Sequence, residues 1–321
     1  MPLSRRQALS RIGSASAVAA ATALLARWRS DDGLPRDARS GGHPQVRDYR
    51  APQDSALPEL VIARNDSDPH ALVAKALAAL GGMQRFVSRG DVVVVKPNVG
   101  WDRAPIHAAN TNPDVVGAVV KAAFDAGAHR VVVTDVSCNE ATRTFQRSGI
   151  WKKAYELGAE VVLPSDHRFR TMRLRGEILD EWPIFTPLVN ADKVINVPIA
   201  KHHNLARYTG AMKNWYGILG GRRNRLHQDI DVSIADLATF MRPTLTIVDA
   251  VRVLVRNGPQ GGNLDDTREV NTVVASVDQV AADAFACTLI GAKPEQIPYL
   301  KLAQDRGIGT SDWASLRGKE V

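Results

Sequence analysis

The sequence predicts an α/β fold with a mostly parallel, doubly wound sheet flanked by helices, as one large domain or two lobes. The 321 residues alternate between short apolar runs and helical segments almost throughout, which is the pattern of successive βαβ units. Runs such as Asp91–Lys96 are apolar between charged ends. Such runs are typical of strands that are buried on both faces, as in a parallel sheet.

The first half of the fold is expected to alternate regularly between strand and helix. Pro69 follows Asp68, and Pro113 follows Asn112; a proline behind a capping side chain marks the first helical position. The expected elements are strand Leu60–Ala63, helix Pro69–Leu80, strand Asp91–Lys96, a helix from Pro113 to about Ala126, strand Arg130–Thr134, helix Thr142–Leu157 with a break at Gly149, and strand Glu160–Leu163.

The second half contains an antiparallel excursion before the alternation resumes. The polar residues between its apolar runs predict turns and loops. The expected elements are a hairpin over Arg170–Pro187, strand Val194–Val197, helix Ser233–Phe240, strand Leu245–Val248, a polar loop over Asn263–Glu269, strand Asn271–Val277, and closing helices Gln279–Ile290 and Pro294–Arg306.

The N-terminus predicts export. The segment Ser4–Leu9, SRRQAL, precedes the weakly apolar run Ile12–Ala26 and resembles a twin-arginine signal peptide over residues 1–30. We therefore expect the twin-arginine export machinery as a partner and a periplasmic or extracellular location. The run is too short and alanine-rich for a good membrane span, so no stable span is expected after cleavage. The alternative is an amphipathic or disordered N-terminus.

The signal would be followed by a linker and one α/β domain. Residues 31–57 are rich in Asp, Arg, Gly, Pro and Ser and lack periodicity, which indicates a linker, and residues 58–321 form the domain. The chain has a net charge of +7, and cleavage after Ala23 would remove three arginines and leave 7 − 3 = +4. No nucleic-acid-binding signature occurs, so no nucleic acid is expected as a partner.

The cysteine count and the absent motifs exclude several classes of site. The two cysteines, Cys138 and Cys287, cannot form a four-thiolate zinc or iron–sulfur site, so no iron–sulfur cluster is expected. Whether they form a disulfide stays open. The sequence lacks a nucleophile elbow, a Walker loop, an HExxH motif and a dinucleotide fingerprint.

Polar residues that follow the predicted strands indicate a binding site. In open α/β sheets ligands bind beyond the carboxyl ends of the strands, so residues that follow different strands can converge there. The candidates for binding a substrate or cofactor are Lys96, Asn98, Lys201, His202, Asn214 and Asp249.

The segment Val197–Gly221 combines cations with aromatic residues. Unpaired buried charges are costly, so this mixture favours a partly enclosed pocket for an anion or a metal. Arg222, Arg223 and Arg225 could clamp a carboxylate or phosphate. The alternatives are a basic loop anchored by its aromatic residues and a solvated basic turn.

Six short blocks are Lys96-Pro97-Asn98, Thr111-Asn112-Pro113, Lys201-His202-His203, Thr209 to Gly217, Ile247-Val248-Asp249 and Gly258-Pro259. Together they resemble the domain of unknown function 362 family over about residues 60–316. Many members of that family carry a ferredoxin-like cysteine cluster, which this chain lacks. The family name supplies no agreed reaction, so the site has to be argued from the residues.

Histidine spacing gives a more distant resemblance. His203 precedes Lys213 by ten positions, His227 follows it by fourteen, and His107 lies four before Thr111. This layout is similar to the nickel-pincer lactate racemase family. The resemblance implies that His203 and His107 are an acid/base pair, that Lys213 holds a pincer cofactor covalently and that His227 is the metal ligand. The lysine-to-histidine spacing differs slightly, and Gly210-Ala211-Met212 replaces a more glycine-rich approach to the lysine.

Three functions are consistent with these features. The first is an exported isomerase, racemase or redox enzyme that depends on a metal or metallocofactor, for example a nickel-pincer-like one, and acts on a small anionic molecule. Histidines suit proton transfer because imidazole titrates near neutrality. The second is a periplasmic protein that binds an anion or metal without catalysis. The third is a maturation factor for another exported protein.

Overall fold

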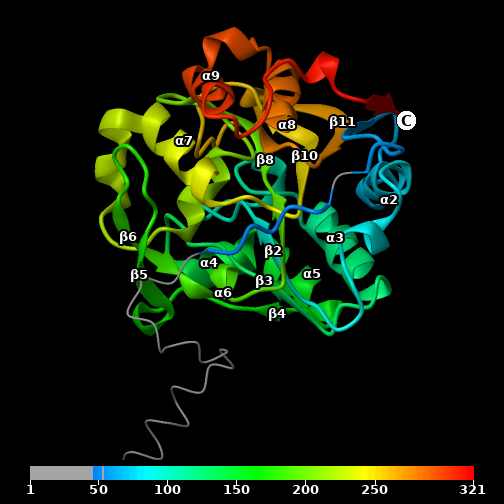
Figure 1. The fold of residues 1–321 in the computed structure, drawn as a ribbon, viewed down its shortest axis with the longest axis horizontal. Coiled ribbons are helices and arrows are strands. Elements are labelled where there is room, and N and C mark those ends of the chain that lie inside the picture. Colours follow the sequence, from blue (N-terminus) through cyan, green and yellow to red (C-terminus); the bar gives the residue numbers. More distant parts are fainter. Residues whose placement is uncertain (1–45, 53) are drawn as a thin grey trace, which may run out of the picture. The chain divides into compact units, whose positions relative to one another are not determined.

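A central sheet organises the part of the chain that the computed structural model describes, residues 46–52 and 54–321 (Figure 1). Its strands are β1 (Leu60–Ala63), β2 (Val92–Pro97), β3 (Arg130–Val133), β4 (Glu160–Val161), β7 (Lys193–Val197), β8 (Ile199–His203), β9 (Arg207–Thr209), β10 (Leu245–Leu254), β11 (Thr267–Ser276) and β12 (Gly318–Glu320). They are ordered β12-β1-β11-β10-β7-β2-β3-β4, with β8 beside β10 and β9 beside β8.

The middle of the sheet is parallel, as the sequence predicts. Strands β10, β7, β2, β3 and β4 run in one direction, whereas β11 is antiparallel to both β10 and β1. Val93 and Val95 contribute to one apolar cluster and Val94 to another, because successive side chains of a strand point to opposite faces. Both faces of β2 are therefore buried.

Helices cover both faces of the sheet. They are α2 (Pro69–Ala79), α3 (Pro113–Asp125), α4 (Ala141–Arg147), α5 (Ile150–Glu156), α6 (Thr186–Val189), α7 (Ile230–Phe240), α8 (Gln279–Ala286) and α9 (Pro298–Asp305). Leu72 of α2, Val119 of α3 and Ile150 of α5 belong to one core cluster. Helices α7, α8 and α9 contribute to the other, and Figure 1 shows them together at the top of the view. The doubly wound architecture is confirmed.

Local signals fixed the starts of the early helices. The Asp68 side chain accepts a hydrogen bond from the amide of His70, and the Asn112 side chain accepts one from Asp114. Pro69 and Pro113 occupy the first helical positions. The expected break at Gly149 separates α4 from α5. The predicted hairpin is a two-stranded sheet of β5 (Phe169–Arg173) and β6 (Glu181–Phe185).

Several predicted boundaries were wrong where tertiary pairing decides the structure. Strand β10 continues past Val248 to Leu254, and β11 begins at Thr267 within the predicted polar loop, because the two strands pair as far as Leu254 and Thr267. The last predicted helix is a 3-10 turn followed by α9, because Pro298 starts a new helix and proline cannot continue one. Strands β8, β9 and β12 were not predicted.

Part of the predicted linker packs on the α/β domain. Residues 1–30, the proposed signal, lie outside the described residues. Within the predicted linker 31–57, Tyr49 is buried and its hydroxyl donates to the carbonyl oxygens of Leu188 and Val189. The described residues 46–52 and 54–321 fall within one compact unit, which is the first of the two predicted alternatives, one large domain or two lobes. No helix in the described part is long and apolar enough to cross a membrane.

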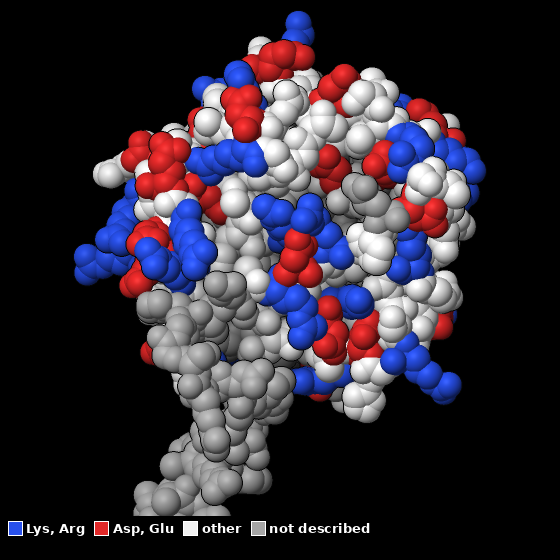
Figure 2. Space-filling view, viewed as in Figure 1, with Lys and Arg blue, Asp and Glu red and all other residues white. Residues whose placement is uncertain are grey.

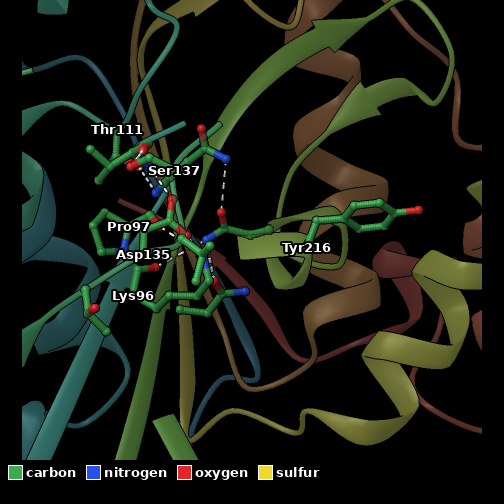
Figure 3. A network of polar contacts seen from close by, with 12 residues as sticks. Lys96, Pro97, Thr111, Asp135, Ser137 and Tyr216 are labelled. Carbon is green, nitrogen blue, oxygen red and sulfur yellow. Dashed lines mark hydrogen bonds and ion pairs between the residues drawn. The ribbon is translucent and has the colours of Figure 1, made fainter. Parts of the chain in front are cut away.

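A buried ion pair joins the ends of β2 and β3. The Lys96 Nζ atom lies 2.6 Å from Asp135 Oδ1, and both side chains are almost fully buried. The other carboxylate oxygen accepts the amide proton of Val99 at 2.6 Å. A Cβ atom on Gly217 would collide with this carboxylate, so the glycine lets the backbone approach the pair. Figure 3 shows Lys96 and Asp135 meeting at the strand ends.

We predict that replacing Lys96 by Met lowers the free energy of unfolding by about 3–5 kcal/mol, because Asp135 then stays buried without its cation. The double variant Lys96→Met/Asp135→Asn should recover part of this loss, because it contains no unpaired buried charge. The side-chain oxygen of the asparagine at position 135 can still accept the amide proton of Val99. Chemical denaturation of the full chain measures both values. Additive effects of the two substitutions would contradict the coupling.

Candidate functional site

A cavity of about 1200 Å³ lies beyond the carboxyl ends of β2 and β3. Side chains from the loops after β2 and β3, from β8 and β9, and from the segment after β9 line it. The predicted residues Asn98, Lys201, His203, Lys213, Asn214 and His227 all contribute to its wall. The expectation that His203, Lys213 and His227 face a common pocket is therefore confirmed.

The β8–β9 hairpin provides one wall of the cavity. Lys201 and His203 are two residues apart on β8, so their side chains point to the same side. Thr209 pairs with Lys201 across the hairpin and also lines the cavity. The hydroxyl of Thr209 is buried without a hydrogen-bond partner among the described residues.

His202, between these two residues, is not among the residues lining the cavity. Its Nδ1 accepts the amide proton of Gly258 at 3.2 Å. Of the two adjacent histidines, only His203 contributes to the pocket, as expected for neighbouring positions of an extended segment.

The surroundings of His203 make it a hydrogen-bond donor. Its Nδ1 accepts the backbone amides of Leu205 and Ala206 at 3.1 and 3.2 Å. A neutral imidazole has one donor and one acceptor nitrogen, so Nε2 carries the proton. Burial, with a smaller contribution from nearby Lys213, lowers the pKa of His203 to about 2. His203 therefore presents a neutral Nε2–H group.

His227 has the opposite arrangement. Its Nδ1 lies 2.9 Å from the carbonyl oxygen of Asn224, which can only accept, so Nδ1 carries the proton and Nε2 keeps a free lone pair. The rings of His203 and His227 are stacked with centroids 6.2 Å apart. Burial, and then Lys213, lower the pKa of His227. The pair thus combines one donor with one base.

Lys213 presents an unpaired amine to the cavity. Its Nζ lies 4.1 Å from the centroid of the Tyr216 ring, within the range of a cation–π contact. Among the described residues it makes no hydrogen bond or ion pair, although the residue is only 7% exposed. Burial lowers the pKa of Lys213 to about 8.

Helix α8 positions the turn that carries Lys213. The Asp283 carboxylate accepts the amides of Ala211 and Met212 at 2.6 and 2.9 Å, directly before the 3-10 helix Lys213–Ile218. Four residues earlier, Gln279 accepts the indole proton of Trp215 at 2.8 Å. A Cβ atom on residue 210 would collide with Asp283, so Gly210 permits this close approach.

A chain of side-chain amides supports the floor of the cavity. Asn214 donates to the side-chain oxygen of Asn196 at 2.8 Å and accepts from Asn98 at 3.1 Å. Asn98 in turn accepts from the Lys201 amine at 2.9 Å. Lys201 also donates to the carbonyl oxygen of Ala109, and burial lowers its pKa to about 7.

The two buried lysines of the cavity, Lys201 and Lys213, lack carboxylate partners among the described residues, although Asp135 and Asp166 also line the cavity. No ion pair to Lys201 or Lys213 occurs in the described part of the chain. The guanidinium of Arg223 donates to the carbonyl oxygens of Val136, Tyr216 and Ser137. Outside the cavity, Lys and Arg are interspersed with Asp and Glu on the face that Figure 2 shows. The unpaired cations of the cavity make it suited to an anion.

The predicted arginine clamp is not a free clamp. Arg223 donates to Val136 and Ser137 in the loop after β3 and to Tyr216 in the 3-10 helix. The guanidinium of Arg225 lies 4.6 Å from the centroid of the Trp182 ring. Arg222 is exposed. Arg223 contributes charge to the wall of the cavity rather than a pair of free donors.

Three further predicted site residues lie outside the cavity. Lys96 forms a buried ion pair with Asp135, so its charge is already neutralised. Asp249 is at the same edge of the sheet but lines a second cavity, where it accepts the amides of Asn112 and Val251. His107 is not among the residues lining the main cavity, and its Nδ1 contacts Ala104. The described structure thus places His203, but not His107, on the wall of the main cavity, and their acid/base pairing stays a prediction.

Thr209 and Asp283 were missed as functional residues. Thr209 was noticed only as part of a sequence block, although its spacing from Lys201 fits a hairpin. Asp283 is a lone acid in the apolar helix segment Gln279–Ala286, and a buried charge in such a helix could have signalled a role. The cysteines do not pair: Cys138 is exposed and free, and Cys287 is buried and free.

Metal binding would need ligands beyond those that the described protein residues provide. Within that part of the chain, no group of three or more His, Cys, Asp or Glu side chains is arranged to hold a metal ion. His227 Nε2 is a single free nitrogen ligand in the cavity. A metal here would need further ligands from water, a substrate or another bound group.

Sequence comparison identifies relatives of the chain. The family described as "Domain of unknown function (DUF362)" matches residues 93–288. Thylakoid-associated protein sll1697 of Synechocystis sp. is 29% identical over 245 residues, which are 72% of either chain. The resemblance to the domain of unknown function 362 family that the sequence blocks predicted is confirmed.

Among solved structures, the lactate racemase apoprotein from Thermoanaerobacterium thermosaccharolyticum matches with a TM-score of 0.41 and 13% identity. The match covers 76% of this chain and 58% of the racemase, so the chain spans less than two thirds of that protein. A TM-score this low establishes neither a shared fold nor a shared function.

Proposed function

The chain belongs to the domain of unknown function 362 family, and we propose that it is an enzyme that binds a small organic anion and moves a proton on it, as an isomerase does. The observation that supports this proposal is the set of unpaired groups in one cavity. Lys213, the Nε2–H of His203 and the free nitrogen of His227 face the same space.

The anion would be held by Lys213 and His203, whose donors have no protein partner among the described residues, and by Lys201, which already donates to Asn98 and Ala109. Charge-assisted hydrogen bonds from Lys201 and Lys213 and a neutral one from His203 are suited to a carboxylate. A bound anion would also offset the cost of burying two ammonium groups without carboxylates.

Proton transfer would use the two histidines in different roles. His227 Nε2 is the proton acceptor, because its lone pair is free and its lowered pKa keeps it neutral near pH 7. The Nε2–H of His203 would stabilise negative charge that develops on the substrate oxygen. This replaces the symmetrical acid/base pair expected from the sequence.

We predict that (S)-lactate and (S)-3-phenyllactate bind more tightly at about pH 6 than at about pH 9, by about tenfold for each lost charge-assisted bond. The pKa values of Lys201 and Lys213, about 7 and 8, mean that both lose their charge as pH rises through this window. Titration calorimetry measures the affinity, and proton NMR in D₂O measures exchange of the C2 proton.

Lys213→Met should weaken binding about tenfold or more, whereas Lys121→Met, at an exposed lysine paired with Asp125, should not. His227→Ala should abolish exchange but retain binding. Affinity that does not change with pH or with Lys213 would contradict the anion site. Binding without any exchange would favour the alternative of an anion-binding protein.

A metal-bearing organic cofactor also fits the residues of the cavity. Lys213 offers a nucleophilic amine without a partner, and His227 offers one nitrogen ligand. Imidazole nitrogen binds nickel, copper and zinc. When bound, such a group would supply hydride or electron transfer. His203 and Lys201 would then orient the substrate anion beside it.

For the cofactor, we predict that protein purified from its native source contains a stoichiometric transition metal by elemental analysis. His227→Ala should lower the metal content because the free nitrogen ligand is lost, while His70→Ala, at an exposed histidine, should not. Metal content that is zero, or that is unaffected by His227→Ala, would oppose this cofactor.

We also propose that the protein is exported by the twin-arginine route to the periplasm or beyond. Arg5→Lys/Arg6→Lys should leave it in the cytoplasm, because a receptor reads the arginine pair rather than bulk charge. Arg27→Lys/Arg29→Lys, which preserves the pair, is the matched control. Cell fractionation measures the location, and normal export of the first variant would refute the signal.

A further inference from the structure

The Lys213 amine has the properties of a covalent nucleophile. Its Nζ has no hydrogen-bond or ion-pair partner among the described residues and lies against the Tyr216 ring. Because burial lowers its pKa to about 8, a neutral fraction exists near physiological pH. A neutral, partly enclosed lysine amine is the group that condenses with carbonyl carbons.

The donors around this amine indicate which carbonyl compounds fit. Lys201 and His203 lie on one strand, and Thr209 faces Lys201 on the next. The Thr209 hydroxyl is buried without a hydrogen-bond partner among the described residues, and Thr209 lines the cavity, so a carboxylate that reached this hydroxyl would satisfy it. Lys213, Lys201 and His203 line the same cavity. A carboxylate held by these donors would have its adjacent carbon close to the amine.

The size and lining of the cavity indicate the rest of the molecule. Its volume of about 1200 Å³ exceeds the usual range of small-molecule pockets. Trp101, Phe169 and Leu219 contribute apolar surface to the lining. This surface matches an apolar side chain rather than a second charged group.

We propose that Lys213 forms an imine with 2-oxo acids that carry an apolar side chain, with the carboxylate bound by Lys201, His203 and Thr209. This inference rests on the proposed anion-binding function. The Nζ lone pair forms a bond to C2, and the carbonyl π pair moves onto oxygen. The two amine protons pass to that oxygen, which leaves as one water as nitrogen forms its second bond to carbon.

The test is to incubate the full chain with phenylpyruvate and sodium borohydride at about pH 8, where the neutral amine is available. Hydride adds to C2 of the imine and a proton to nitrogen. Intact mass should rise by the mass of phenylpyruvic acid less one oxygen atom, and peptide mapping should place the change on Lys213. Phenylacetone, the matching ketone without a carboxylate, should label at least about tenfold more slowly because it lacks the hydrogen bonds of the carboxylate to Lys201, His203 and Thr209.

Two variants separate reactivity from folding. Lys213→Arg keeps a cation but cannot form an imine, so it should bind 3-phenylpropionate and show no labelling. His203→Asn keeps an acceptor for the amides of Leu205 and Ala206 but removes the donor from the cavity, so labelling should slow several-fold. Lys121→Ala should label as fast as the unchanged protein.

The following results would overturn the imine. Labelling that is spread over surface lysines would show that the reaction is not specific to Lys213. Labelling by phenylacetone as fast as by phenylpyruvate would show that no carboxylate site directs it. Binding of 3-phenylpropionate without labelling would leave the anion site intact and exclude the imine, whereas loss of both would refute the proposed function as well. A mass excess before any oxo acid is added, absent in Lys213→Arg, would mean that Lys213 already carries a cofactor.

Discussion

The Lys96–Asp135 ion pair is the interaction around which the site is arranged. It joins the ends of β2 and β3 in a fully buried position, and Asp135 also fixes the amide of Val99 in the loop that borders the cavity. The backbone at Gly217 packs directly on the carboxylate. Because Asp135 is committed to Lys96, it is not available to neutralise Lys201 or Lys213, and those two lysines stay unpaired.

Unpaired lysines in a buried cavity lower the stability of the fold, and the proposed anion-binding function would account for their presence. Each ammonium loses hydration without gaining a carboxylate, which is unfavourable, and burial accordingly lowers the pKa values of Lys201 and Lys213. The turn that carries Lys213 is held by Asp283 and Gln279 of α8. These contacts from α8 thus fix the turn that carries Lys213 and leave its amine free. Proteins often accept such local strain at sites that bind ligands.

Much of the fold was predictable because its signals are local. Asp68 and Asn112 cap helices beside prolines, and the valines of β2 form an uninterrupted apolar run. The extensions of β10 and β11 were not predictable, since the polar residues near Leu254 and Thr267 become strand only by pairing with each other. In the site, the blocks around Lys201 and Lys213 were found by composition. Three predicted site residues lie outside the main cavity: Lys96, Asp249 and His107. They were predicted because they follow strands or match a spacing, and neither criterion specifies which partner a side chain contacts.

The sequence by itself determined the main alternation of strands and helices, the family and the concentration of cations and histidines between Val197 and His227. These follow from periodicity, capping and composition, which act over a few residues. The tertiary structure decided which groups are free to act. Two backbone amides fix the proton of His203 on Nε2, and one carbonyl leaves the Nε2 of His227 unprotonated. An aspartate on β3's following loop neutralises Lys96 alone. These outcomes depend on contacts between segments distant in the chain or on the geometry of a folded turn, and the identity of the residues does not encode them individually.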